Sequence, residues 1–180
     1  MMKKPKNKNK KIVVAVSGGF DPIHYGHTRQ FEAAKKLGDE LVVILNNDNW
    51  MMKKKGYIFM PEKERAEIIA AFRSVDRVVL TKHLKNPKDM SVCEELRRLR
   101  PAIFGNGGDR KPDWHPVPEV ALCQELGIKM VYNLGRGGKV QSSSWLTKRY
   151  EETIECFCKS GKKYRKCHGV EKKPARTKKS

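Results

Sequence analysis

The stretch SGGFDPIHYGH, residues 17–27, directly follows the apolar run IVVAV of residues 12–16 and leads into a helical pattern. A short β-branched run of this kind is typical of a buried parallel strand. The two glycines allow the backbone to approach a ligand closely, and the start of the following helix offers unpaired N–H groups to a phosphate. We therefore expect a strand, a phosphate-binding loop and a helix in this order.

Two histidines in this stretch are three residues apart. His24 and His27 have Gly26 between them, so both imidazoles can reach the same small region beside a helix N-terminus. Two imidazole donors in that position suit negative charge that develops on phosphorus during a reaction. Histidines placed for packing, or as metal ligands, are the alternative interpretation.

Outward from this loop, short apolar runs alternate with helical patterns. Further strands are expected at residues 41–45, 78–80, 102–104 and 129–132, with helices before, between and after them up to about residue 154. Such alternation indicates βαβ crossovers and a parallel sheet with helices on both faces. The predicted fold is α/β, a Rossmann-like doubly wound parallel sheet of about five strands. Ligands bind outside the carboxyl ends of the strands in such sheets, so the loops after strands one, two, four and five are the candidate sites.

The loop after the first strand resembles that of the cytidylyltransferase-like nucleotidyltransferases, whose hallmark is a G-x-F-D-x-x-H-x-G-H stretch in this place. Residues 18–27 match it in order and spacing. The resemblance implies that His24 and His27 are catalytic. It also implies a set of nucleotide-binding residues in this loop, namely Gly18, Gly19, Phe20, Asp21 and Gly26.

The resemblance extends through most of residues 12–150. It implies a mobile lysine loop that closes on the triphosphate, with the candidate catalytic residues Lys53, Lys54 and Lys55. A solvated loop is the alternative. Arg65 and Arg73 are similar in position to arginines of the glycerol-phosphate cytidylyltransferases and are candidates to bind the phosphate of the acceptor, although Arg73 equally suits a surface position.

Two later stretches bear on nucleotide binding. Residues 107–109 resemble the G-G-D of heptose-phosphate adenylyltransferases and the related G-D-D of the cytidylyl branch, with a tight polar turn as the alternative. Residues 135–144 read GRGGKVQSSS, where the family usually carries R-x-x-G-I-S-T-T. This departure leaves the identity of the base open, and Ser142 or Ser143 could simply cap the next helix. The nucleotide-binding candidates from the two stretches are Gly108, Asp109, Arg136, Ser142, Ser143 and Ser144.

Residues 156–168 read CFCKSGKKYRKCH. Their candidate metal ligands, Cys156, Cys158, Cys167 and His168, form a common tetrahedral zinc set. A segment this short and polar cannot build its own hydrophobic core, so the metal would fold it. The stretch resembles the zinc-binding SEC-C motif, and a closed set of protein ligands implies a structural Zn²⁺ ion. Incidental cysteines are the alternative.

The net charge of +19 is concentrated at the two ends of the chain. Residues 1–11 contribute six lysines and no acid, and residues 158–180 contribute ten Lys or Arg against one Glu. We expect a basic disordered arm at 1–11, a nucleotidyltransferase domain at 12–154, a zinc knuckle at 155–170 and a basic tail at 171–180. Such ends are solvated tails, or they dock to an acidic protein or to RNA.

The chain has no run approaching the roughly 20 apolar residues that span a bilayer, and no signal-peptide pattern at its start. A cytoplasmic protein without membrane association is therefore expected, and a homodimer is left open. The expected reaction transfers CMP or AMP from CTP or ATP to a small phosphorylated acceptor, such as a sugar or polyol phosphate, and releases pyrophosphate. Mg²⁺ would accompany the nucleotide. The alternative is a ribosome- or nucleic-acid-associated protein in which this domain only binds; the basic ends favour it and the intact histidine pair opposes it.

Overall fold

The computed structural model describes residues 11–107, 118–135, 141–156, 158, 160–163 and 166. The chain forms two compact units, residues 1–141 and residues 142–180. The first unit carries the sheet. The predicted basic arm, apart from Lys11, and the basic tail lie outside the described residues.

A parallel sheet of five strands organises the first unit, in the order β3-β2-β1-β4-β5. The strands are β1 (Val13–Gly18), β2 (Glu40–Leu45), β3 (Arg77–Leu80), β4 (Ile103–Gly107) and β5 (Lys129–Leu134). The chain winds outward from β1 to β3 and then returns to β4 on the other side of β1. This reversal is the topological switch point at which such sheets bind ligands. The predicted doubly wound α/β fold is confirmed.

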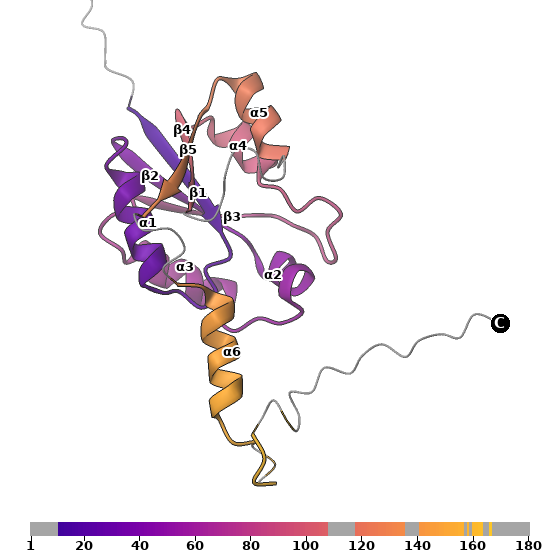
Figure 1. The fold of residues 1–180 in the computed structure, drawn as a ribbon. Coiled ribbons are helices and arrows are strands. Elements are labelled where there is room, and N and C mark those ends of the chain that lie inside the picture. Colours follow the sequence, from indigo (N-terminus) through magenta and orange to yellow (C-terminus); the bar gives the residue numbers. More distant parts are fainter. Residues whose placement is uncertain are drawn as a thin grey trace, which may run out of the picture. The chain divides into compact units, whose positions relative to one another are not determined.

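Helices cover both faces of the sheet (Figure 1). One core holds Val14 and Val16 of β1 together with buried side chains of α1 (Tyr25–Lys35) and α3 (Glu62–Ala70). The other core holds Ala15 together with buried side chains of α4 (Cys93–Leu99) and α5 (Pro118–Leu126). Because successive strand residues point to opposite faces, a single β-branched run supplies both cores.

The predicted lysine loop is wrong in one respect, because its lysines end a helix, α2 (Asp48–Lys55). Asn47 caps the start of this helix and accepts a hydrogen bond from the N–H of Trp50 at 3.0 Å. Gly56 ends it in the left-handed conformation, with φ at 80°. Lysines in the last turn interact favourably with the partial negative charge at a helix C-terminus, and the fully buried Met51 anchors the helix to the sheet domain.

The second unit begins with α6 (Ser143–Thr153), which has Ser142 at its N-cap position. Beyond the helix the chain turns back on itself, since Glu155 and Lys163 form an antiparallel bridge and the N–H of Cys156 donates to the carbonyl of Lys162 at 2.7 Å. Across the described parts of both units, no helix has the length and apolar character that crossing a membrane requires.

Candidate active site

The two histidines of the loop after β1 lie against each other at the start of α1. Their rings are stacked, with centroids 3.7 Å apart and planes inclined by 20°. The main-chain N–H of His24 donates to Nδ1 of His27 at 3.3 Å, and the N–H of His27 donates to the carbonyl of His24 at 2.8 Å. The structure therefore brings the predicted pair together at the carboxyl end of β1.

The site lowers the pKa of both imidazoles. Burial, followed by the neighbouring His24 and the charge of Lys55, lowers the pKa of His27 to about 3. Burial and Lys55 also lower the pKa of His24, against an opposing hydrogen bond to its own backbone. Since Nδ1 of His27 accepts a hydrogen bond, its single proton lies on Nε2. His27 is thus a neutral hydrogen-bond donor.

Lys55 is the lysine of α2 whose charge acts on the histidine pair. Its Nζ donates to the carbonyl of Asp21 at 2.6 Å, and burial lowers its pKa more than the nearby Asp21 raises it. Lys53 instead donates to Oδ1 of Asn86 at 2.6 Å, and Lys54 is exposed. Of the three predicted lysines, the structure therefore places Lys55 beside the histidines.

Arg65 is fully buried, which argues against the predicted contact with an acceptor phosphate. Its guanidinium donates to four oxygens, the carbonyls of Met60, Gly19 and Asn46 and Oδ1 of Asp48, at 2.8, 2.7, 2.8 and 2.5 Å. These bonds tie the loops after β1 and β2 to α3. Arg65 is placed to hold the shape of the site, because little of its hydrogen-bonding capacity remains for a ligand.

Arg73 is not brought to the histidine pair. It lies between the end of α3 and the start of β3, so it sits at the amino-terminal edge of the parallel sheet, opposite the edge that carries His24. There it lines a surface hollow of about 490 Å³ with Lys35 and Lys36. The chain crosses from the carboxyl edge of the sheet after β2 to the amino-terminal edge before β3. The similarity in sequence position to the family's arginines did not reveal that Arg73 lies at this opposite edge.

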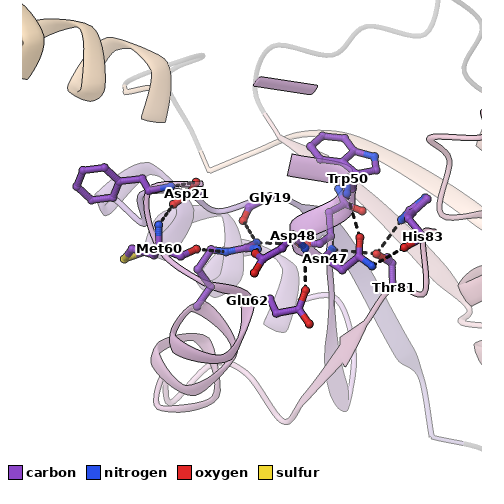
Figure 2. A network of polar contacts seen from close by, with 12 residues as sticks. Gly19, Asp21, Asn47, Asp48, Trp50, Met60, Glu62, Thr81 and His83 are labelled. Atoms are coloured by element: carbon purple, nitrogen blue, oxygen red, sulfur yellow. Dashed lines mark hydrogen bonds and ion pairs between the residues drawn. The ribbon is translucent and has the colours of Figure 1, made fainter. Parts of the chain in front are cut away.

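Asp21 forms hydrogen bonds within the protein. Its side chain is fully buried, and its carboxylate oxygens accept the N–H groups of Phe59 and Met60 at 2.9 and 2.7 Å (Figure 2). This engagement favours a role in fixing the segment after α2. The predicted direct contact between Asp21 and nucleotide finds no support in this geometry.

The remaining loop residues are packed against the histidines and α2. The ring of Phe20 meets the ring of His27 edge-on, with centroids 4.9 Å apart. A Cβ atom on Gly19 would lie 2.5 Å from the sulfur of Met51, so glycine allows α2 to close on the loop. Gly18 is constrained similarly by the ring of Phe20. These positions therefore shape the loop.

A second polar network, which the sequence did not single out, joins the ends of β2 and β3 (Figure 2). The N–H of Asn47 donates to Oγ1 of Thr81 at 3.0 Å, and its side-chain amide donates to the carbonyl of His83 at 2.8 Å. Nδ1 of His83 lies 2.8 Å from the same Thr81 hydroxyl. The available signal was the polar run Asn46–Asn49 directly after a buried strand.

Several predicted residues cannot be placed in this site. Gly108, Asp109 and Arg136 lie outside the described residues, and Ser142, Ser143 and Ser144 belong to the second unit. Gly26 lies in the first turn of α1, between the histidines.

Half of the predicted zinc set is described. The sulfurs of Cys156 and Cys158 lie 3.4 Å apart at the turn that follows α6. Two thiolates on one tetrahedral zinc ion are separated by roughly 3.8 Å, given Zn–S bonds of about 2.3 Å. Cys167 and His168 lie outside the described residues.

The family model described as cytidylyltransferase-like matches residues 15–132, which span the histidine loop and all five strands except the first two residues of β1 and the last two of β5. This chain belongs to the cytidylyltransferase-like family. It is 41% identical over 159 residues to a FAD synthase of Pyrococcus horikoshii, covering 83% of this chain and 97% of that protein. It is 37% identical over 123 residues to the bifunctional protein HldE of Desulfatibacillum aliphaticivorans, covering 67% of this chain and 24% of that protein.

A solved structure agrees with this cytidylyltransferase-like assignment. The lipopolysaccharide core biosynthesis protein of Thermoplasma volcanium superposes with a TM-score of 0.57 at 27% identity, covering 71% of this chain and all of the other. The relatives named FAD synthase and HldE are nucleotidyltransferases, and the chain is an enzyme of that class.

Proposed function

We propose that this enzyme transfers AMP from ATP to a small phosphorylated acceptor and releases pyrophosphate. The observation that carries the proposal is the similarity to a FAD synthase over 97% of that protein's length. FAD synthase joins AMP to FMN, and the HldE relatives join AMP to a heptose phosphate. Both favour ATP over CTP, which the sequence motifs alone left open.

In the proposed reaction, an oxygen of the acceptor phosphate attacks the α-phosphorus of ATP. The new P–O bond forms while the bond from the α-phosphorus to the bridging oxygen breaks, and pyrophosphate leaves with that electron pair. Phosphoryl transfers of this kind depend mostly on positioning and on neutralising charge. The loop after β1 supplies both, because it presents main-chain N–H groups at the start of α1 beside two imidazoles.

His27 acts as a neutral donor in this scheme. His27 carries its proton on Nε2, where it can donate to a phosphate oxygen and stabilise the transition state. Lys55 supplies positive charge beside the pair, fixed by its bond to the carbonyl of Asp21. Asp21 and Arg65 hold the surrounding loops, so the donors are positioned before substrate arrives.

Mg²⁺ is the expected companion of the triphosphate, and when bound it would neutralise charge on the leaving pyrophosphate. The described residues hold no group of three or more His, Cys, Asp or Glu side chains suited to a metal ion. The carboxylate of Asp21 is occupied by two main-chain amides, and that of Asp48 by Arg65. Because these carboxylates are already engaged, the site fits a Mg²⁺ ion that is held mainly by the oxygens of the phosphates.

FMN is the acceptor that the surface of the site favours. Tyr25, Tyr57 and Phe59 are 50%, 36% and 53% exposed, although they lie beside the buried groups of the site. Tyr25 adjoins His24, and the ring centre of Tyr57 lies 5.8 Å from Nζ of Lys55. Exposed aromatic rings next to a phosphate site suit a substrate that combines a flat ring system with a phosphate. A sugar phosphate is the second candidate, favoured by the HldE relatives.

A panel of substrates tests this proposal. Pyrophosphate release is measured with ATP and with CTP, each combined with FMN, a heptose phosphate and glycerol phosphate, in the presence of Mg²⁺. The proposal expects the highest kcat/KM with ATP and FMN. A preference for CTP, or turnover with glycerol phosphate alone, would contradict it.

We also propose that Cys156, Cys158, Cys167 and His168 bind one Zn²⁺ ion, which folds residues 155–170 as a knuckle after α6. Support comes from the 3.4 Å separation of the two described sulfurs and from the turn that brings Lys163 back beside Glu155. In this proposal the basic tail docks to an acidic protein or to RNA, and transfer is confined to the sheet domain.

A further inference from the structure

Among the described residues, three buried side-chain atoms lack a hydrogen-bond partner: Nδ1 of His24, Oδ1 of Asn46 and Nδ2 of Asn106. Asn46 and Asn106 are only 4% and 5% exposed. An unsatisfied buried polar atom costs free energy, and native proteins contain few of them. All three lie at the carboxyl edge of the sheet, where ligands bind.

The two asparagines flank β1. Leu45 pairs with Gly18, so Asn46 follows immediately on one side of the loop, while Gly105 pairs with Val16, so Asn106 lies on the other side. Neighbouring strands are about 4.8 Å apart, which separates the main chains of β2 and β4 by roughly 10 Å. That distance accommodates a sugar or polyol unit with a hydrogen bond at either end.

Both side chains belong on the same face of the sheet. Ile44 of β2 and Phe104 of β4 pack in the core beneath α4 and α5. Asn106 comes two residues later within β4. Asn46 lies one residue beyond the end of β2, where its N–H still donates to the carbonyl of Gly18 at 2.9 Å, so it continues the strand. Side chains two apart along a strand share a face. The two amides can therefore serve one ligand.

The unpartnered atoms specify the chemistry of that ligand. Nδ2 of Asn106 can only donate, and Oδ1 of Asn46 can only accept. A phosphate oxygen would satisfy the first but not the second. Hydroxyl groups both accept and donate, so a ligand with several hydroxyls satisfies both amides.

We propose that Asn46 and Asn106 are substrate-positioning residues that bind hydroxyl groups of a sugar or polyol. The inference rests on the proposed nucleotidyl transfer at this edge of the sheet. The hydroxyls belong either to the ribose of ATP or to the acceptor, whose ribityl chain in FMN carries the same chemistry. Deoxy nucleotides and FMN distinguish these two sources.

Asn47 provides a matched control. It is also buried, at 7% exposure, but its Oδ1 accepts from Trp50 and its Nδ2 donates to the carbonyl of His83. Leucine at this position removes two formed bonds, so Asn47→Leu should lower the Tm. Asn46→Leu and Asn106→Leu remove atoms that are unsatisfied without ligand, so the Tm of each should stay the same or rise.

Calorimetry measures the affinity of wild type and variants for ATP, for 2′-deoxy-ATP, for 3′-deoxy-ATP and for FMN, independently of turnover. We expect Asn46→Leu and Asn106→Leu to weaken binding of ATP or of FMN by roughly ten-fold, the effect of one buried hydrogen bond. If the ribose is the source, the deoxy nucleotides already bind the wild type weakly and the variants add little to that loss. If the acceptor is the source, the affinity for FMN falls and that for ATP is retained.

Affinities for ATP and FMN within two-fold of wild type in both variants would overturn the inference, as would a fall in Tm equal to that of Asn47→Leu. Wild-type binding without pyrophosphate release would refute the proposed reaction and still decide the role of the asparagines. A wild type that binds neither ATP nor FMN would refute both.

Discussion

The main-chain N–H of His24 donates to Nδ1 of His27 at 3.3 Å, so the cap of α1 also fixes the tautomer of the imidazole proposed to act in catalysis. The bond accounts for one nitrogen of the ring and leaves the proton on the other. One hydrogen bond therefore both caps the helix and places the proton of His27 on Nε2.

Two substitutions of His27 distinguish its role as an acceptor at the start of α1 from its proposed role as a donor in catalysis. An asparagine side chain can supply an acceptor near the position of Nδ1, whereas glutamine can supply a donor near the position of Nε2. We expect His27→Asn to fold normally and to lower kcat by about 10²-fold with a smaller change in affinity for ATP. His27→Gln should retain more activity. Equal kcat in wild type and His27→Asn would remove His27 from the mechanism.

The buried, neutral His27 makes stability depend on pH. Its pKa is about 3 in the folded protein, against an ordinary value of 6.5, so below pH 6.5 the unfolded chain takes up a proton that the folded chain does not. The free energy of unfolding should therefore fall as pH decreases, by up to about 2 kcal/mol between pH 7.5 and pH 5. Urea unfolding at the two values measures this, and His27→Gln should show a correspondingly smaller decrease. The same decrease in the variant would assign it to other groups.

Substitution of Arg65 should destabilise the protein, whereas substitution of Arg73 should leave its stability almost unchanged. Arg65→Met leaves the carbonyls of Gly19, Asn46 and Met60 without their donor, so we expect a loss of roughly 2–4 kcal/mol in the free energy of unfolding. Arg73→Ala removes an exposed side chain and should change it by less than about 0.5 kcal/mol. If Arg65→Met keeps wild-type stability and instead raises the KM for the acceptor, the predicted acceptor contact was right and the positioning role is wrong.

The lysines of α2 should not be equivalent. Lys55→Met removes the charge beside the histidines and should lower kcat by roughly 10- to 100-fold. Lys54→Met removes an exposed charge from the same helical turn and serves as the matched control, with an expected change below about three-fold. Steady-state kinetics with ATP and FMN compares them. A larger effect at Lys54 would show that α2 rearranges when substrate binds.

The zinc proposal predicts about one zinc ion per purified chain, measured by elemental analysis. Changing Cys156 and Cys158 together to serine should abolish it. Removal of residues 156–180 should leave kcat within about three-fold of wild type, since a closed ligand set offers no position to substrate. Zinc that persists in the double variant would refute the ligand assignment. A collapse of kcat on truncation would show that the tail contributes to the active site.

The order of strands and helices could be predicted because the spacing of apolar residues along the sequence indicates which face of each element is buried. The run at residues 12–16 predicted β1, which spans Val13–Gly18, and the four later strands were found within a few residues of their bounds. Helix α2 was missed because the family resemblance implied a mobile lysine loop at this place, and the alternative considered was a solvated loop. Its signals were local, with Asn47 able to cap the start and Gly56 suited to the end.

The candidate site was predictable where chemistry follows from local spacing and not where it follows from burial. His24 and His27 are three residues apart, and a helix start necessarily brings them together. Arg65 attracts attention in a sequence because arginine binds phosphate, but its burial depends on distant carbonyl groups. Asn46 and Asn106 are 60 residues apart in the sequence, and only the pairing of β1 with both neighbouring strands makes them a pair.

Transfer of isotope from the acceptor tests the central claim most directly. FMN with an ¹⁸O-labelled phosphate is incubated with ATP, Mg²⁺ and the enzyme, and the products are analysed by mass spectrometry. Attack on the α-phosphorus predicts FAD that keeps every labelled oxygen of the FMN phosphate, with unlabelled pyrophosphate released in equal amount. Labelled pyrophosphate or labelled inorganic phosphate, or the absence of FAD while ATP is consumed, would contradict the account.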